Sequence, residues 1–192
     1  MRLFQKNYNS IILKKQLLTV IDLLDKHNIP YHLEGGTLLG IIRDGRIIPW
    51  DHDTDISIMS CDYERLALIF DEIKKKGLRL KVKPFISEHT FNPQNIVQRL
   101  IKIKDKKFYF FPGANTLDIF VKYPHNNKVY WVAQDNTMTV PDKFYIKYEE
   151  VPWENRMIKV PCYYKEYLTL KYGDWQKVNK EWNCDMELTI VK

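Results

Sequence analysis

The feature that most constrains this sequence is a run of acids that leads into an alternating apolar segment. Asp51, Asp53 and Asp55 occupy every second position, and the alternation continues through Ile56 and Ile58. Side chains at alternate positions of a strand point to the same face, so the pattern predicts a strand over Asp53–Met59 with its carboxylates on one face. The Cα atoms of Asp53 and Asp55 would lie about 6.6 Å apart along such a strand. Like charges at this spacing repel each other unless a cation or a proton lies between them.

Two carboxylates this close can hold one hard cation, or bridge two cations about 3.5–4 Å apart. An EF-hand calcium loop also carries acids at its first, third and fifth positions. That loop requires glycine at position six and glutamate at position twelve, where this chain has Ile56 and Asp62, so we reject it. An acid-rich loop without any ligand is the remaining alternative, because a single Asp-x-Asp pair is common by chance.

Two neighbouring segments favour the metal-binding interpretation. Gly35, Gly36 and Thr37 join a predicted strand to the start of a predicted helix, where free backbone N–H groups and the helix dipole attract phosphate. Asp118 is the one acid of the apolar segment 117–121. A charge in such a strand needs a partner or a metal, so we expect Asp118 to complete a three-carboxylate site for phosphoryl transfer.

The spacing of apolar residues predicts both helices and strands. Ser10 is the expected N-cap of the first helix, the residue before Pro30 ends it, and Gly77 stops the third. Helices are predicted over 10–28, 37–43, 62–76 and from about Pro161 to Tyr172-Gly173, and strands over 31–33, 53–59, 78–83, 96–104, 107–111 and 117–123. This order predicts an α+β fold with a mixed sheet flanked by helices. With no linker-like segment, we expect one domain over residues 1–192.

Composition and charge narrow the partners. The net charge of +6 suits anionic ligands. Lysines cluster at 74–76 and at 102, 104, 106 and 107, but a solvated helix end and a hairpin edge explain these clusters equally well. A basic balance alone is a weak sign of nucleic-acid binding, so we expect no nucleic-acid partner.

The cysteines and the N-terminal segment point to an intracellular protein. Cys61, Cys162 and Cys184 are far apart and form no CxxC pair, which predicts neither a disulfide framework nor a zinc knuckle. The first residues do not build the apolar run of a signal peptide or of a transmembrane segment. We therefore expect a cytoplasmic location.

Longer stretches of the chain resemble the LicD family, which includes bacterial phosphocholine transferases, fukutin and fukutin-related proteins. The resemblance is most specific over residues 35–43 and 48–56, and it extends to 117–120 and 160–175. It implies a nucleotidyltransferase-like fold in which Asp53 and Asp55 bind the metal and Asp118 is the third acid. Gly36 and Thr37 then take the phosphate-facing turn.

The resemblance also implies roles at the edge of the site. Arg43 matches the family's arginine, which steadies a phosphate or braces the acidic loop, and Asp51 becomes a supporting loop acid near the substrate. The chain departs from the family pattern at two positions. His52 stands where the family often has a third consecutive acid, and Val121 stands where it usually has proline. On strand alternation His52 points away from the metal, so its presence should not disable the site.

The function implied by the resemblance is transfer of a phospho-alcohol group from a CDP-activated donor to a hydroxyl of a glycan or glycolipid acceptor, with release of CMP. Mg²⁺ or Mn²⁺ would serve as the cofactor, and CDP-choline, CDP-ribitol and CDP-glycerol are the candidate donors. A choline group would suit an aromatic cage, for which Trp131, Trp153, Tyr163 and Tyr164 are candidates. Two alternatives stay open: a true nucleotidyltransferase that uses an NTP, and a catalytically silent domain that binds glycan or nucleic acid.

Overall fold

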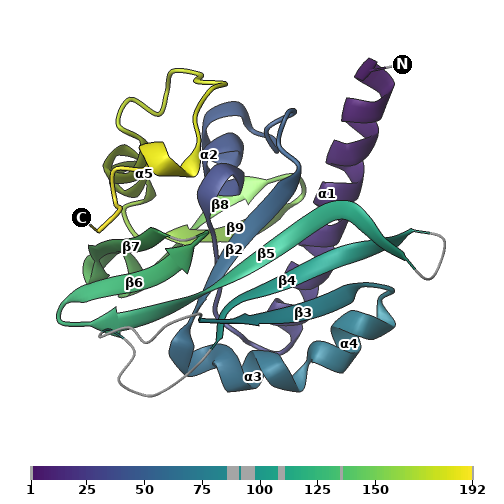
Figure 1. Ribbon diagram of the computed structural model, residues 1–192, viewed down its shortest axis with the longest axis horizontal. Coiled ribbons are helices and arrows are strands. Elements are labelled where there is room, and N and C mark those ends of the chain that lie inside the picture. Colours follow the sequence, from purple (N-terminus) through teal and green to yellow (C-terminus); the bar gives the residue numbers. More distant parts are fainter. Residues whose placement is uncertain (1, 86–90, 92–97, 108–110, 135, 192) are drawn as a thin grey trace.

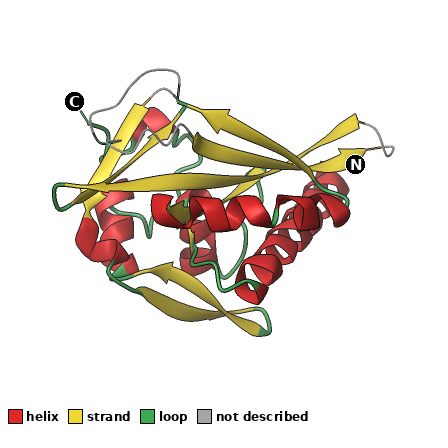
Figure 2. Ribbon diagram, turned by 90° about the horizontal axis from the view of Figure 1, so that it is seen from below, coloured by secondary structure: helices red, strands yellow, loops and turns green. Residues whose placement is uncertain are grey.

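The computed structural model describes the whole chain except residues 1, 86–90, 92–97, 108–110, 135 and 192. Three layers are visible when the molecule is turned on its side (Figure 2). A large sheet forms one outer layer, the helices lie beneath it, and a small two-stranded sheet covers the opposite side of the helices. This arrangement confirms the predicted α+β fold with a mixed sheet flanked by helices.

The large sheet is ordered β1-β2-β5-β4-β3, and only β2 and β5 run parallel to each other along this path (Figure 1). The end of β5 also pairs with β6, which in turn pairs with β7, while β8 and β9 form the separate small sheet. The strands are β1 (His32–Leu33), β2 (Asp53–Met59), β3 (Arg79–Pro84), β4 (Gln98–Lys107), β5 (Phe111–His125), β6 (Lys128–Ala133), β7 (Asn136–Pro141), β8 (Tyr148–Trp153) and β9 (Arg156–Pro161).

Five α-helices and three short 3-10 helices accompany these strands in the described part of the chain. The α-helices are α1 (Arg2–Lys26), α2 (Gly35–Asp44), α3 (Tyr63–Leu68), α4 (Phe70–Lys75) and α5 (Tyr164–Tyr172), and the 3-10 helices are Ser60–Asp62, Asp142–Tyr145 and Cys184–Met186. None of these helices is long and apolar enough to cross a membrane.

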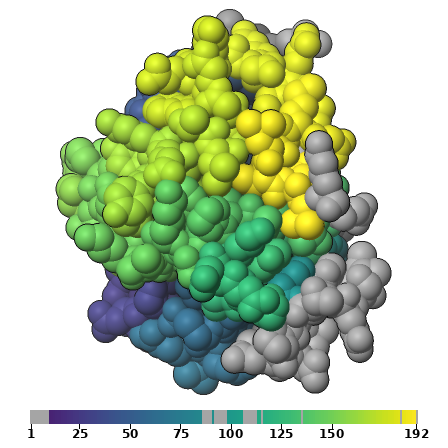
Figure 3. Space-filling model, turned by 90° about the vertical axis from the view of Figure 1, so that its left-hand side faces the viewer, coloured from purple at the N-terminus to yellow at the C-terminus, as the bar shows by residue number. Residues whose placement is uncertain are grey.

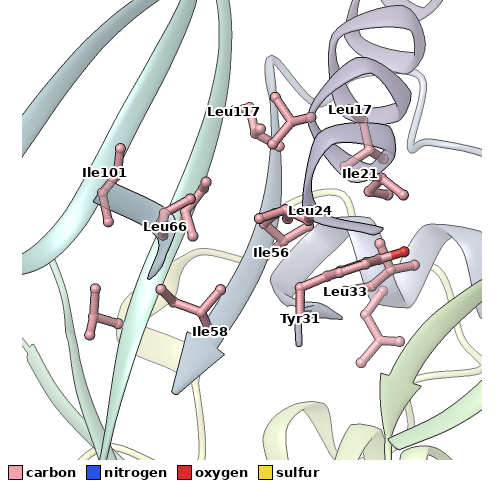
Figure 4. Close-up of a cluster of buried hydrophobic side chains, with 14 of the residues drawn as sticks. Leu17, Ile21, Leu24, Tyr31, Leu33, Ile56, Ile58, Leu66, Ile101 and Leu117 are labelled. Atoms are coloured by element: carbon pink, nitrogen blue, oxygen red, sulfur yellow. The ribbon is translucent and has the colours of Figure 1, made fainter. Parts of the chain in front are cut away.

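Strand alternation divides the large sheet into an apolar face and a charged face. On the apolar face, Ile56, Ile119, Ile101 and Val82 lie opposite one another across β2, β5, β4 and β3. Helix α1 covers this face with Leu17, Ile21 and Leu24, which are spaced along one side of the helix and fully buried (Figure 4). The core therefore fixes β2 and β5 from below and turns their other side chains toward the outer face.

Two predicted helices differ from the observed ones. Helix α1 already begins at Arg2, so Ser10 lies inside it and does not cap it, and it ends at Lys26. The predicted helix over 62–76 is two helices that meet at Ile69, whose φ of −99° and ψ of 5° interrupt the helical geometry. The break keeps Leu66, Ile69 and Ile73 buried while the two short helices follow the sheet, and no proline or glycine marks it.

The strand predictions are right at the centre of the sheet and wrong at several connections. The predicted strand Asp53–Met59 matches β2 at both ends. The predicted strand over 107–111 does not match one strand, because β4 ends at Lys107 and β5 begins at Phe111. Residues 96–97 and 108–110 of the predicted strands lie outside the described residues. Pro161 ends β9 instead of starting the last helix, which begins at Tyr164. Strands β6 to β9 were not predicted; each has only six residues, and β7, β8 and β9 each contain a proline, which disfavours a strand.

Gly40 offers a test of how tightly α2 packs on the loop that leads to the acids. A Cβ at Gly40 would lie 2.7 Å from the backbone oxygen of Arg46 and 2.7 Å from Cγ1 of Ile48. We predict that Gly40→Ala lowers the free energy of unfolding by about 1–3 kcal/mol, although alanine is the better helix former. Urea unfolding measures this, and Leu68→Ala, at an exposed side chain, should change it by less than about 0.5 kcal/mol. An alanine variant as stable as the wild type would contradict the close packing.

Candidate metal centre

The parallel pair β2 and β5 brings three predicted acids together. In the register of the two strands Asp55 lies opposite Asp118. Asp53 comes two residues before Asp55 on β2 and therefore lies on the same face of the sheet. One carboxylate oxygen from each of Asp53, Asp55 and Asp118 lies within 4.8 Å of the other two. Neighbouring strands are only about 4.8 Å apart, so side chains that share a register position on one face are forced into proximity.

The clustering of these carboxylates changes their protonation. Burial, followed by the charges of Asp53 and Asp118, raises the pKa of Asp55 well above its ordinary value. Burial and the neighbouring Asp51 raise the pKa of Asp53 to about 6. The cluster therefore favours the binding of protons or of a cation, because the like charges destabilise one another.

Asp118 is held so that one of its oxygens faces the cluster. Its Oδ2 accepts a hydrogen bond from the Lys102 ammonium at 2.8 Å, whereas its Oδ1 is buried and has no hydrogen-bond partner among the described residues. Burial raises the pKa of Asp118, although Lys102 opposes the shift. A buried carboxylate oxygen without a partner costs free energy, and a cation would satisfy it. Three carboxylates form the hard oxygen donor set that Mg²⁺ and Mn²⁺ prefer, so these residues fit such an ion.

The glycine pair at the start of α2 allows the chain to approach these acids closely. Gly35 has a φ of +56°, and a Cβ added to it would lie 2.7 Å from Oδ2 of Asp55. A Cβ on Gly36 would lie 2.5 Å from Oδ2 of Asp51. At these distances a larger residue at either position would displace a carboxylate. Both glycines also line a cavity that contains the acids.

The other predicted site residues lie around this centre in different ways. Thr37 is buried beside the cavity, and its hydroxyl accepts a hydrogen bond from the Asp55 backbone N–H at 2.8 Å, so it fixes β2 and does not face the cavity. Arg43 lines the cavity, while its guanidinium donates two hydrogen bonds to Asp44 at 2.9 and 2.8 Å. Asp51 lines the cavity as well, and the neighbouring His52 side chain is exposed.

The acids form one wall of a cavity of about 520 Å³. Lys83, Arg99 and Lys102 from β3 and β4 supply basic residues to the same lining, and Lys102 contacts Asp118 directly. Residues near the C-terminus, including Lys180 and Trp182, close another side. Acidic and basic residues in one cavity suit a ligand that carries phosphates together with a metal ion.

Several aromatic residues line this cavity, and most of them were not predicted. Trp131 was among the four proposed cage residues and does line the cavity, but the Lys122 ammonium lies 3.1 Å from the centre of its ring. The Trp153 indole N–H donates to the Gly45 carbonyl, and Tyr163 and Tyr164 line a separate surface pocket. The remaining rings in the cavity are Trp50, Phe120, Tyr172 and Trp182.

The C-terminal segment is anchored on β7. The Thr139 N–H donates to the Thr189 carbonyl at 2.9 Å, and the Val191 N–H donates to the Thr137 carbonyl at 2.8 Å. In Figure 3 this segment, drawn in yellow, packs directly against the green residues of the middle of the chain. The anchoring positions the wall that contains Lys180 and Trp182.

A buried ion-pair cluster beneath the cavity was missed by the sequence analysis. Glu34 is the N-cap of α2. Its carboxylate forms ion pairs with Lys171 at 2.6 Å and Lys122 at 2.8 Å, and it accepts a hydrogen bond from the Tyr167 hydroxyl at 2.9 Å. Lys171 also pairs with Glu187 at 3.2 Å. These residues join α2, β5, α5 and the C-terminal segment.

The charges of this cluster depend on one another. Burial alone would raise the pKa of Glu34, but Lys122 and Lys171 outweigh burial and hold that pKa well below its ordinary value. Burial lowers the pKa of Lys122 to about 7 despite its partner. The sequence carried one usable signal for the cluster, since Lys122 stands in the apolar strand Val121-Lys122-Tyr123 and needs a buried anion.

The raised pKa of Asp53 predicts a specific pH dependence without metal. Because its pKa is about 6 in the folded protein and 3.8 in the reference state, the folded state binds the proton more tightly. Its contribution to stability is present below pH 4 and is lost as the pH rises through 6. The predicted quantity is the free energy of unfolding of the wild type minus that of Asp53→Asn, measured in EDTA. We predict that this difference falls by about 1–3 kcal/mol when the pH is raised from 4 to 7.

Urea unfolding at several pH values measures this difference. Asp71→Asn is the matched control, because the exposed Asp71 is paired with Lys74, which lowers the pKa of Asp71. A difference for Asp53→Asn that stays constant between pH 4 and pH 7 would contradict the repulsion within the cluster.

The ion-pair cluster predicts a large effect for a small substitution. Glu34→Gln keeps the shape of the side chain but leaves Lys122 and Lys171 buried without their shared anion. We predict a loss of about 3–5 kcal/mol in the free energy of unfolding. Glu154→Gln, which removes the exposed pair with Lys14, should cost at most about 1 kcal/mol. Equal stability of the two variants in thermal unfolding would show that the buried cluster does not hold the fold together.

This chain is similar to several known proteins. The model of the family described as LicD/FKTN/FKRP, nucleotidyltransferase domain, matches residues 28–163. An uncharacterized protein of Rickettsia typhi is 32% identical over 131 residues, which cover 68% of this chain and 34% of the relative. Ribitol 5-phosphate transferase FKRP of Homo sapiens is 27% identical over 166 residues, which cover 80% of this chain and 30% of the relative.

A bacterial relative of known activity is also similar. Lipopolysaccharide cholinephosphotransferase LicD of Haemophilus influenzae is 27% identical over 127 residues, which cover 62% of this chain and 48% of the relative. The chain thus spans between 30% and 48% of the length of these three relatives. Because the family model covers most of the chain, including Asp53, Asp55 and Asp118, this protein belongs to the LicD/FKTN/FKRP family.

Proposed function

We propose that this protein transfers a phospho-alcohol group, such as phosphocholine or ribitol 5-phosphate, from a CDP-activated donor to a hydroxyl of a glycan acceptor, with release of CMP. The observation that carries the proposal is the three-carboxylate cluster of Asp53, Asp55 and Asp118, with its unsatisfied buried oxygen on Asp118. The relatives with named activities support the class of group transferred, since their names are those of choline-phosphate and ribitol-phosphate transferases.

Asp53, Asp55 and Asp118 would hold one or two Mg²⁺ or Mn²⁺ ions. When bound, such a cation neutralises charge on the donor diphosphate and on the departing CMP. The protein's own residues bind and orient the donor. Arg99, Lys83 and Lys102 line the same cavity as the acids and present positive charge that can contact phosphate oxygens.

The aromatic residues of the cavity provide a place for the donor's base. Trp182 lies against Tyr172 with ring centres 4.9 Å apart, and the Lys180 ammonium lies 5.3 Å from the centre of the Trp50 ring. Planar rings at a cavity wall bind a nucleobase by stacking. We propose that the cytosine of the donor stacks on this side, with its diphosphate directed toward the acids.

The reaction itself requires few additional groups. The acceptor hydroxyl attacks the phosphorus that bears the alcohol, a new oxygen–phosphorus bond forms, and the bond to the CMP oxygen breaks. The hydroxyl proton passes to a carboxylate, for which we propose Asp118. Positioning and electrostatic stabilisation account for most of the rate in such transfers.

The test is release of CMP from CDP-choline, CDP-ribitol or CDP-glycerol in the presence of Mg²⁺. We predict release that EDTA abolishes and that Asp53→Asn reduces by about 100-fold or more, while Asp71→Asn leaves it unchanged. Pyrophosphate release from CTP or ATP, without CMP release from any CDP-alcohol, would make the protein a true nucleotidyltransferase. No turnover with any of these donors would favour a silent binding domain and contradict the proposal.

A further inference from the structure

The outer face of the large sheet is divided into an acidic and a basic half. Across four neighbouring strands, Asp55 on β2 lies opposite Asp118 on β5, which lies opposite Lys102 on β4, which lies opposite Lys81 on β3. The next row on the same face runs from Asp53 through Thr116 and Lys104 to Arg79. The charge changes from negative to positive between β5 and β4 in the first row, and between β2 and β4 in the second, where Thr116 on β5 is neutral.

The basic half contains a cavity of its own. This second cavity has a volume of about 650 Å³, and its lining contains five basic residues and no acidic residue. The lining residues are Lys74, Leu78, Arg79, Leu80, Lys81, Lys102 and Lys104. Lys102 lines both this cavity and the one that contains the acids, so the two cavities are neighbours on the sheet.

Most of the charge in the basic half is not neutralised by the protein. Lys74 pairs with Asp71, and Lys102 pairs with Asp118. Within the described ranges, Arg79, Lys81 and Lys104 make no ion pair with an acid. Three such cations around one hollow repel each other, and an anion bound between them relieves the repulsion.

The composition of the lining indicates which anion fits. Proteins that bind single-stranded nucleic acid combine a basic groove with aromatic residues on which the bases stack. The lining of the second cavity contains no aromatic residue, and its apolar part consists of two leucines. This pattern favours isolated anionic groups, such as phosphate or carboxylate, over a run of stacked bases.

The position of the basic half relates it to the acceptor. Lys81 on β3 lies in the same row as Asp118, two interstrand steps of about 4.8 Å and therefore about 10 Å away, and Arg79 lies two residues along the same strand. The donor is expected in the first cavity, so the second cavity lies beside the point of attack. A short oligosaccharide whose hydroxyl reaches Asp118 could extend over this surface.

We propose that Arg79, Lys81 and Lys104 form a binding site for an anionic group of the acceptor, which makes an acidic glycan, bearing phosphate or carboxylate groups, the preferred acceptor. This inference rests on the proposed function for the role of the acceptor. The binding site itself does not depend on turnover, so the two can fail separately.

Binding of two matched oligosaccharides tests the site directly. The probes are maltotetraose and the same tetrasaccharide with a phosphate on a primary hydroxyl, each titrated calorimetrically into the full chain. We predict at least tenfold tighter binding of the phosphorylated probe, weakened by added salt. The triple variant Arg79→Gln, Lys81→Gln, Lys104→Gln should lose about tenfold in affinity for that probe.

A control variant separates local binding from net charge. Lys75→Gln, Lys76→Gln, Lys147→Gln removes the same charge at exposed lysines that line neither cavity, and it should bind the phosphorylated probe within about twofold of the wild type. Lys81→Glu alone, at one exposed side chain, should weaken binding even if the triple variant proves unstable.

Three outcomes would overturn the inference. The first is equal binding of the two tetrasaccharides, and the second is wild-type affinity in both the triple variant and Lys81→Glu. The third is tighter binding of a ten-nucleotide single-stranded RNA than of the phosphorylated probe, lost in the same variants, which would assign the surface to nucleic acid. Binding of the phosphorylated probe without any release of CMP would uphold this site and count against the proposed function instead.

Discussion

The parallel pairing of β2 with β5 is the constraint on which the rest of the molecule depends. It places Asp55 opposite Asp118 and brings Asp53 onto the same face, so three carboxylates converge within 4.8 Å at the surface of the sheet. Packing on the other face holds this register, because Ile56 and Leu117 are buried under α1, and a slip of one residue would turn the acids into the core. The fold therefore stabilises an arrangement that is electrostatically unfavourable without a cation.

A second layer of interactions holds the surroundings of the acids. Gly35 and Gly36 bring the start of α2 into contact with Asp55 and Asp51, since neither position has room for a Cβ. Glu34, one residue earlier, anchors that turn to Lys122 and Lys171 beneath the cavity. Loss of one partner from a buried cluster of this kind is strongly destabilising, because the remaining charges stay buried without compensation. The same cluster includes Glu187, which pairs with Lys171. The cluster therefore connects the C-terminal residues that line the cavity to the buried residues beneath it.

The sequence predicted the centre of the molecule better than its periphery. Strand β2 was predicted at both ends, because its period-two alternation is sustained and lies beside the core, and Asp118 was singled out because it is isolated among apolar residues. The hairpins β6–β7 and β8–β9 were missed, since their strands are short and β7, β8 and β9 each contain a proline. The Glu34 cluster could not be predicted as a set, because Glu34 and its partner Lys171 are 137 positions apart in the sequence and meet only through the fold. The division of the sheet face into acidic and basic halves depends in the same way on strand order, which local patterns do not contain.

The most direct test of the metal centre is the position of a bound cation. Crystals grown with Mn²⁺ and CDP-choline would locate the ion by its anomalous scattering. We predict a peak about 2.0–2.5 Å from carboxylate oxygens of Asp53, Asp55 and Asp118, in contact with the donor's diphosphate. A bound donor with no peak at these three carboxylates, or with a peak held by other residues, would contradict the assignment of the centre.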